Sequence, residues 1–166
     1  IRQYPDSALR MRANEVEEGD DSLQALTERM SRLMQEARGV GLAAPQIGVL
    51  RRVLVYQISD DDPVLALVNP RVLETGGESE TSEEGCLSLG SASVVVPVER
   101  ALSLTVEATS PAGDPLRIEA EGLEARVIQH ELDHLDGVLI VDRTTPEGRR
   151  EALAKLRPQP ILGPLA

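Results

Sequence analysis

The feature that most constrains this chain is a short run that holds both of its histidines, His130-Glu131-Leu132-Asp133-His134. On an α-helix, residues four apart lie nearly above one another, so His130 and His134 can present two imidazoles to one ion. Glu131 lies about 100° further round the helix, where it can reach a water bound to that ion but cannot easily join the ligand set. The run therefore predicts a helix around which the rest of the fold is built.

Residues 122–136 are expected to form this helix, and Gly137 stands where a left-handed C-terminal cap is common. One broad face of the helix carries both histidines together with apolar side chains: Leu123, Val127, His130, His134 and Leu135. We therefore expect the histidines to point into the protein rather than toward open water.

A metal held by two histidines needs a further protein ligand. Metallopeptidases of the H-E-x-x-H-x-x-G-x-x-H type place a third histidine where this chain has Ile140, and the downstream acids Glu147 and Glu151 lie in a polar, basic stretch. The single cysteine, Cys86, is the better candidate, because metal binding would hold it as a thiolate. Two histidines and Cys86 would leave a position open for water, as in catalytic sites.

Such a site predicts hydrolysis of an amide. The metal would lower the pKa of its bound water and polarise a carbonyl, and Glu131 would carry the proton from the water to the leaving amine. The resulting oxyanion needs fixed hydrogen-bond donors, each of which lowers the activation barrier by about 3 kcal/mol. The side chain of Gln46, a lone amide in an apolar, glycine-rich stretch, and the backbone N–H of Leu87 are the candidates. A structural hydrogen bond from Gln46 to the backbone is the alternative.

The length of 166 residues predicts one domain, residues 1–166, with a substantial core. Because the chain has two Tyr and no Phe or Trp, that core must be aliphatic, and base-stacking platforms are not expected. The net charge of −11 disfavours general binding to nucleic acid or anionic membranes. The sequence contains no run of 18 apolar residues, so a membrane-spanning helix is not expected. A lone thiol fits a reducing compartment.

The remaining pattern predicts an α+β fold: antiparallel β-sheets around the central metal-binding helix, with an N-terminal and a C-terminal helix. After an extended arm over 1–16, a helix is expected from Asp21, as its cap, to Arg38, and a last helix after Thr145-Pro146. Short strands are expected at 53–58, 64–68, 71–74, 93–98, 102–107, 116–120 and 138–141.

Three segments together resemble the signature motifs of peptide deformylases, in the family's order and approximate spacing. They are Gly39-Val40-Gly41-Leu42-Ala43-Ala44-Pro45-Gln46, Glu84-Gly85-Cys86-Leu87-Ser88 and Gln129-His130-Glu131-Leu132-Asp133-His134. The opening Tyr4-Pro5-Asp6 with Leu9-Arg10 resembles the usual start of that family. After Ser88 the family commonly has a proline and a nearby arginine, whereas this chain continues Leu89-Gly90-Ser91 and has its next arginine at Arg100.

The resemblance implies a metal-dependent hydrolase that acts in N-terminal processing during protein biosynthesis. It would remove the N-formyl group of nascent peptides that begin with formyl-methionine and would release formate. By the family pattern Cys86, His130 and His134 bind the metal, often iron as Fe²⁺, with Zn²⁺ (zinc), Ni²⁺ or Co²⁺ as substitutes. Glu131 would be the general base and acid, and Gln46 with the Leu87 amide would hold the oxyanion.

The resemblance further implies how substrate and partners are bound. The peptide would add as a strand near Val40, Gly41 and Gly85. The last helix, with Arg149 and Arg150, resembles the segment that docks on the ribosome, although a solvated charged helix is an equal alternative. We expect a cytoplasmic, bacterial monomer without other nucleic-acid contacts. Because the chain begins with Ile, a removed organellar targeting segment stays open.

Two alternatives to this activity stay open at this point. One is a zincin-like peptidase, which would cleave internal peptide bonds. The other is a protein with a closed, structural metal site, or a deformylase relative without activity.

Overall fold

The computed structural model describes residues 1–90 and 94–157. The chain forms four α-helices, seven strands and two 3₁₀ turns in these residues. In chain order they are η1 Ser7–Arg10, α1 Leu23–Glu36, β1 Gly41–Ala43, η2 Ala44–Ile47, β2 Val53–Tyr56, β3 Leu65–Thr75, β4 Ser79–Glu84, β5 Val96–Ala101, β6 Ser103–Thr109, β7 Pro115–Glu121, α2 Gly122–Leu135, α3 Ile140–Arg143 and α4 Pro146–Leu156.

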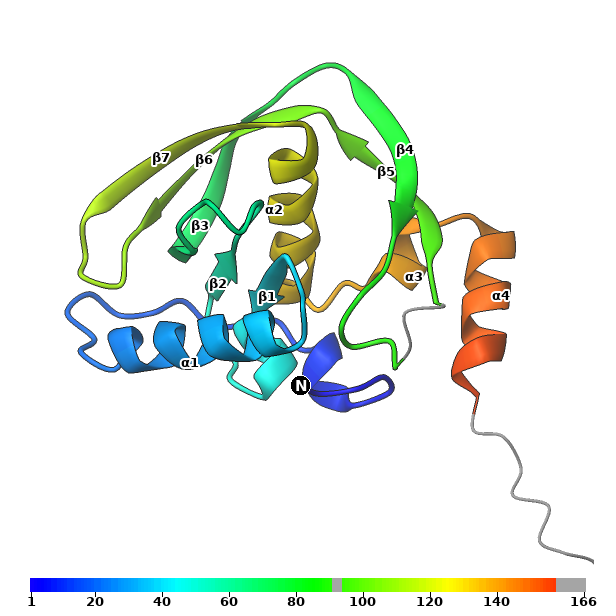
Figure 1. Cartoon of the computed structure of the whole chain (residues 1–166), viewed down its shortest axis with the longest axis horizontal. Helices are drawn as coiled ribbons and strands as arrows, with labels where there is room; N and C mark the ends of the chain where they lie inside the picture. Colours follow the sequence, from blue (N-terminus) through cyan, green and yellow to red (C-terminus); the bar gives the residue numbers. More distant parts are fainter. Residues whose placement is uncertain (91–93, 158–166) are drawn as a thin grey trace, which may run out of the picture.

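Two antiparallel sheets enclose the central helix α2, as predicted (Figure 1). The larger sheet has the order β1-β2-β3-β6-β7, and β4 pairs with β5 in the smaller one. The chain passes directly from β3 in the large sheet into β4 in the small one, and it returns directly from β5 into β6. The two sheets are therefore joined by two short connections. Helix α2 contacts both sheets, which places its histidines between them.

Aliphatic side chains form the core, as the composition predicts. One buried cluster lies between the large sheet and α2, a second joins β5 to α3 and α4, and a third covers α1, β1 and β2. Tyr56 is the one aromatic residue in these three clusters that is fully buried. The helix α1 buries Leu23, Met30 and Met34, whereas Ala37, which follows its last residue, is exposed.

Several expected elements are confirmed. The strands β6 and β7 pair as a hairpin with Val106 opposite Ile118, and the last helix begins at Pro146 after the Thr145 cap. Pro97 lies in the two-stranded sheet, where both strands are edges. Gly137 follows α2 with φ 73°, the left-handed conformation expected of a C-terminal cap.

Other expectations were wrong, each for a local reason. Residues 138–141 were expected as a strand, but they lead into α3, because the Asp142 carboxylate accepts the Leu139 N–H at 2.9 Å and starts a helical turn. Residues 64–68 and 71–74 were expected as two strands, but they belong to one, β3. Asn69 adopts φ 50° as an irregularity within the single long strand β3.

At the N-terminus, residues 1–16 are not wholly extended, because η1 forms a turn capped by Asp6. Helix α1 begins at Leu23 without a side-chain cap, and Asp20 accepts the Ser22 N–H at 2.8 Å just before it. In the second sheet, β4 was not expected as a strand, and β5 begins at Val96 rather than Ser93, a residue outside the described ranges.

Gly137 gives a direct test of how tightly α2 is held. A Cβ at this position would lie 2.5 Å from the Arg10 carbonyl oxygen, whereas Gly113, also left-handed at φ 93°, has no atom within 4 Å of such a Cβ. We expect Gly113→Ala to reduce the free energy of unfolding by about 1–2 kcal/mol through backbone strain alone. Gly137→Ala should cost clearly more in the same urea titration, because of the added clash. Equal losses would mean that the α2 end is not packed as described.

Candidate metal centre

Helix α2 and the loop after β4 bring the three predicted metal ligands together. His130 and His134 lie one turn apart on α2, with ring centroids 5.0 Å from each other. Cys86 follows β4 and reaches the same point from the smaller sheet, with its Sγ 3.3 Å from His134 Nε2. One ligand atom from each of the three residues lies within 4.8 Å of the others. The spacing of the sequence motif thus becomes a compact group with one sulfur and two nitrogen donors.

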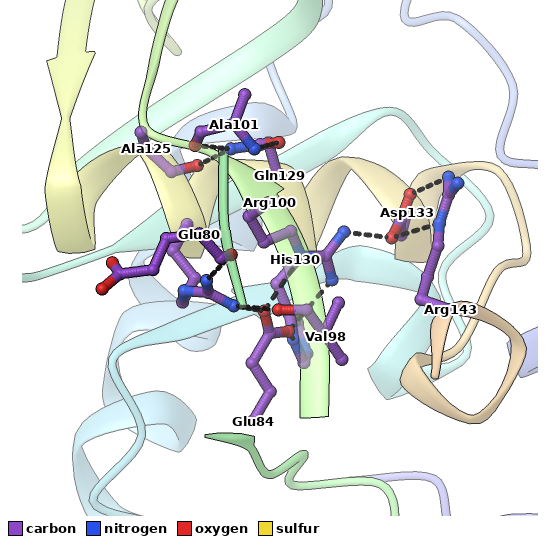
Figure 2. A network of polar contacts seen from close by, with 11 residues as sticks. Glu80, Glu84, Val98, Arg100, Ala101, Ala125, Gln129, His130, Asp133 and Arg143 are labelled. Atoms are coloured by element: carbon purple, nitrogen blue, oxygen red, sulfur yellow. Dashed lines mark hydrogen bonds and ion pairs between the residues drawn. The ribbon is translucent and has the colours of Figure 1, made fainter. Parts of the chain in front are cut away.

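A buried carboxylate, Glu84, orients the first histidine (Figure 2). One of its oxygens, Oε1, lies 2.9 Å from His130 Nδ1, while Arg100 donates to both oxygens at 2.9 and 3.0 Å. Arg126 donates at 2.6 Å to the other oxygen, Oε2. Burial opposes ionisation of Glu84, but the hydrogen bonds from His130 and Arg100 outweigh it and hold its pKa at about 2. An ionised Glu84 fixes the ring orientation of His130 and leaves Nε2 to face the sulfur.

The network continues from Arg100 to the far end of α2. Arg100 Nη1 donates to Asp133 Oδ2 at 2.6 Å, and Arg143 in α3 donates to both Asp133 oxygens at 3.1 and 2.8 Å (Figure 2). Sequence reasoning missed these charged residues. Two of them could have been noticed in the sequence, because Glu84 lies in the cysteine motif and Asp133 in the histidine motif. Asp133 is also a charged residue next to the inward face of its helix.

The electrostatics of the two rings suit a cation. Burial, with the neighbouring charges of His130 and Arg100, lowers the pKa of His134 well below its usual range, so the ring is neutral and able to ligate. Burial would also lower the pKa of His130, but hydrogen bonds to Cys86 and Glu84 raise it well above the usual value. A proton held on His130 Nδ1 by Glu84 leaves the other ring nitrogen, Nε2, free to ligate a cation.

Glu131 lies in the same buried region with no competing partner. It is 4% exposed, and its Oε2 forms no hydrogen bond within the described residues. Burial raises the pKa of Glu131 to about 7. Gly41 makes this possible, because a Cβ there would lie 2.5 Å from Glu131 Oε1. The carboxylate therefore occupies space that only a glycine leaves free.

The surroundings of Gln46 fit both of its predicted roles, an oxyanion donor and a structural hydrogen bond to the backbone. The side chain is 1% exposed; its Oε1 accepts the Ala43 N–H at 2.9 Å, a structural bond to the backbone. Its Nε2 donates to Ser88 Oγ at 3.1 Å and lies 3.8 Å from Cys86 Sγ. One end of the amide is thus fixed by β1, and the other end faces the sulfur.

A cavity of about 520 Å³ opens onto this group. Every predicted site residue except His134 lines it: Val40, Gly41, Gln46, Gly85, Cys86, Leu87, His130 and Glu131. Leu123, expected in the core, is instead 54% exposed and lines this cavity. In the segment that departs from the family pattern, Leu89 is fully buried and Ser91 lies outside the described residues.

Comparisons with known proteins identify the family of this chain. The sequence model of the polypeptide deformylase family matches residues 1–150. The chain belongs to the peptide deformylase family. Two peptide deformylases, from Natranaerobius thermophilus and Chromohalobacter salexigens, are each 43% identical to it, covering 91% and 95% of this chain and 95% and 92% of their own lengths.

Solved structures of the family share the fold. A peptide deformylase from Legionella pneumophila superposes with a TM-score of 0.87 at 44% identity, covering 94% of this chain and 91% of its own. One from Synechococcus elongatus, in complex with actinonin, gives 0.87 at 40% identity, with 93% and 85% covered. The predicted family, the α+β fold and the activity of a metal-dependent hydrolase that removes the N-formyl group of nascent peptides are confirmed.

The Glu84 carboxylate gives a test of the metal centre that does not depend on turnover. We expect Glu84→Gln to weaken metal retention by about 10–100-fold, because the amide lacks the charge that orients and polarises His130. Competition with a coloured chelator measures this. Glu80→Gln, an exposed neighbour on β4, is the matched control, and circular dichroism of both variants verifies folding. Equal retention in the two variants would show that Glu84 does not support the ligand.

Proposed function

We propose that Cys86, His130 and His134 hold the metal ion of the family. The observation that carries this proposal is the group of ligand atoms within 4.8 Å of one another, next to a buried Glu131 whose Oε2 has no hydrogen-bond partner among the described residues. The donors fit a divalent transition metal: a thiolate, a neutral His134 ring and a His130 ring backed by a carboxylate. When bound, the metal supplies Lewis-acid chemistry, polarising the formyl carbonyl and lowering the pKa of water.

We propose Fe²⁺ as the native ion. This choice rests on the family resemblance, since one sulfur and two nitrogen donors also accept Zn²⁺, Ni²⁺ or Co²⁺.

Glu131 moves the proton in this proposal. Its carboxylate accepts a proton from the attacking water and donates it to the amine of the methionine residue as the formyl C–N bond breaks. A pKa near 7, set by burial, is suited to both steps at neutral pH. Gly41 keeps the carboxylate in place by leaving room for Oε1.

Gln46 and Leu87 stabilise the oxyanion. The bond from Ala43 N–H fixes the amide of Gln46 so that Nε2 faces the site, and removing one such donor costs about 3 kcal/mol of transition-state stabilisation in related chemistry. The backbone N–H of Leu87, which follows Cys86 directly, is the second donor in this assignment.

The peptide binds as an added strand between the two sheets. Strand β1 is an edge of the large sheet, and Gly41 in it lines the same cavity as Val40 and as Gly85, which follows β4. Backbone groups at these three positions would hold the peptide, and the cavity would take the methionine side chain. The glycines allow the close approach of a second backbone.

The cellular setting follows from the proposed activity. Residues 1–166 act as one catalytic domain, a monomer in the bacterial cytoplasm where formylated chains are made. Arg149 and Arg150 of α4 would approach the ribosome. None of the helices within 1–90 and 94–157 has the length and apolar character of a membrane span.

Formate release from a formyl-Met peptide tests the assignment. We expect activity in the unmodified protein, a loss of at least about 100-fold in Glu131→Gln with metal retained, and loss of both metal and activity in Cys86→Ala. Coupling formate to a dehydrogenase measures the rate, and metal analysis measures content. Full activity in Cys86→Ala would refute the ligand assignment, whereas cleavage of internal peptide bonds would indicate a zincin-like peptidase.

A further inference from the structure

Arg38 occupies an unusual position at the end of α1. Its N–H donates to the Gln35 carbonyl at 3.0 Å, and the Gly39 N–H donates to the Met34 carbonyl at 2.9 Å. These two bonds end the helix in the way that usually requires a residue of left-handed conformation. That residue is Arg38, with φ 56°, where glycine is usual. The chain therefore carries a long cationic side chain at a position that disfavours any side chain.

The next residue, Gly39, lies where a side chain would meet the cavity wall. A Cβ on Gly39 would lie 2.6 Å from Leu87 Cδ1, the residue after the Cys86 ligand. Gly39 thus packs closely at the cavity wall, and Arg38, one residue earlier, lines the same cavity while remaining exposed. The backbone places the guanidinium at the mouth rather than in the interior.

The charges that line the cavity differ in whether they are paired. Glu84, Arg126 and His130 are tied to one another by hydrogen bonds, and Glu131 is buried. Arg38 and Glu83 form no ion pair or side-chain hydrogen bond with any residue of the described ranges. Glu83, the other unpaired charge of the cavity wall, is an anion and precedes the buried Glu84 on β4. Among the cationic side chains of the cavity wall, Arg38 is therefore the one without an ion pair to any described residue.

We propose that Arg38 makes this enzyme favour formylated peptides that carry an acidic residue shortly after the formyl-methionine. This inference rests on the proposed function and names the substrate class of the same site. The net charge of −11 repels acidic peptides in general, and a free guanidinium at the mouth offsets that repulsion where the peptide enters. Val40 and Leu123, 46% and 54% exposed, also line the cavity and give the peptide backbone an apolar surface to lie on.

The experiment compares formyl-Met peptides that differ in one side chain. Glu, Gln and Lys are placed either second or third after the formyl group in C-terminally amidated peptides, which removes the terminal carboxylate. At low salt we expect kcat/KM for Glu over Lys to be about two- to fivefold higher in at least one of the two positions, mainly through KM, and to shrink as salt is added.

Four substitutions at one position separate charge from backbone strain. The Glu/Lys ratio should persist in Arg38→Lys, fall to about one in Arg38→Gln and Arg38→Gly, and invert in Arg38→Glu. Arg38→Gly relieves the left-handed strain, so it keeps the test valid if Arg38→Gln folds poorly. Because each result is a ratio within one variant, general effects on folding or metal content cancel.

Two results would overturn the inference: equal rates for Glu and Lys peptides in the unmodified protein, or a preference that survives in Arg38→Gln and Arg38→Gly. The second result would assign the preference to another group. Failure of the proposed function looks different, because no peptide of the series would then release formate.

Discussion

The structure depends on one buried ion-paired carboxylate. Glu84 ends β4, touches His130 on α2, and accepts hydrogen bonds from Arg100 on β5 and Arg126 on α2 (Figure 2). These contacts tie the small sheet to the central helix beside Cys86, which we propose as a metal ligand. Removing one partner of such a buried group typically costs 3–5 kcal/mol, because the remaining charge is left without compensation. We infer that the network is kept for the geometry it imposes on the ligands more than for stability.

Close approach of backbone and side chain is the second requirement of the site. Gly41 leaves room for the Glu131 carboxylate, and Gly39 leaves room for Leu87. The first contact keeps a buried acid in position without a hydrogen-bond partner at Oε2, and the second brings the chain after α1 against the residue that follows Cys86. The glycines of this motif therefore act as space for functional side chains, and not only as points of backbone freedom.

Much of this was predictable from sequence, because periodicity and rare residues carry the information. The i, i+4 spacing of His130 and His134 fixed their shared helix face, and the scarcity of histidine and cysteine singled out Cys86 as the partner. The hairpin of β6 and β7 followed from strict alternation. These signals are local and depend on few residues.

The features that were missed depend on long-range contacts. Strand β4 is polar on both faces and exposed except at Glu84, so it has no alternating pattern, and its pairing with β5 cannot be seen locally. The apolar run 138–141 resembles a strand, but no strand of the described residues pairs with it, and the Asp142 side chain caps a helical turn, α3, at this point. Likewise, the link from Arg143 through Asp133 and Arg100 to Glu84 joins residues from four elements, and no spacing rule predicts it.

The central claim is that one thiolate and two imidazoles hold the metal, and X-ray absorption spectroscopy of the zinc-loaded protein tests it most directly. The account predicts one sulfur at about 2.3 Å and two nitrogens at about 2.0–2.1 Å, with the remaining position filled by a light atom. The sulfur contribution should disappear in Cys86→Ser. A first shell without sulfur, or one with the same scattering in both proteins, would contradict the account.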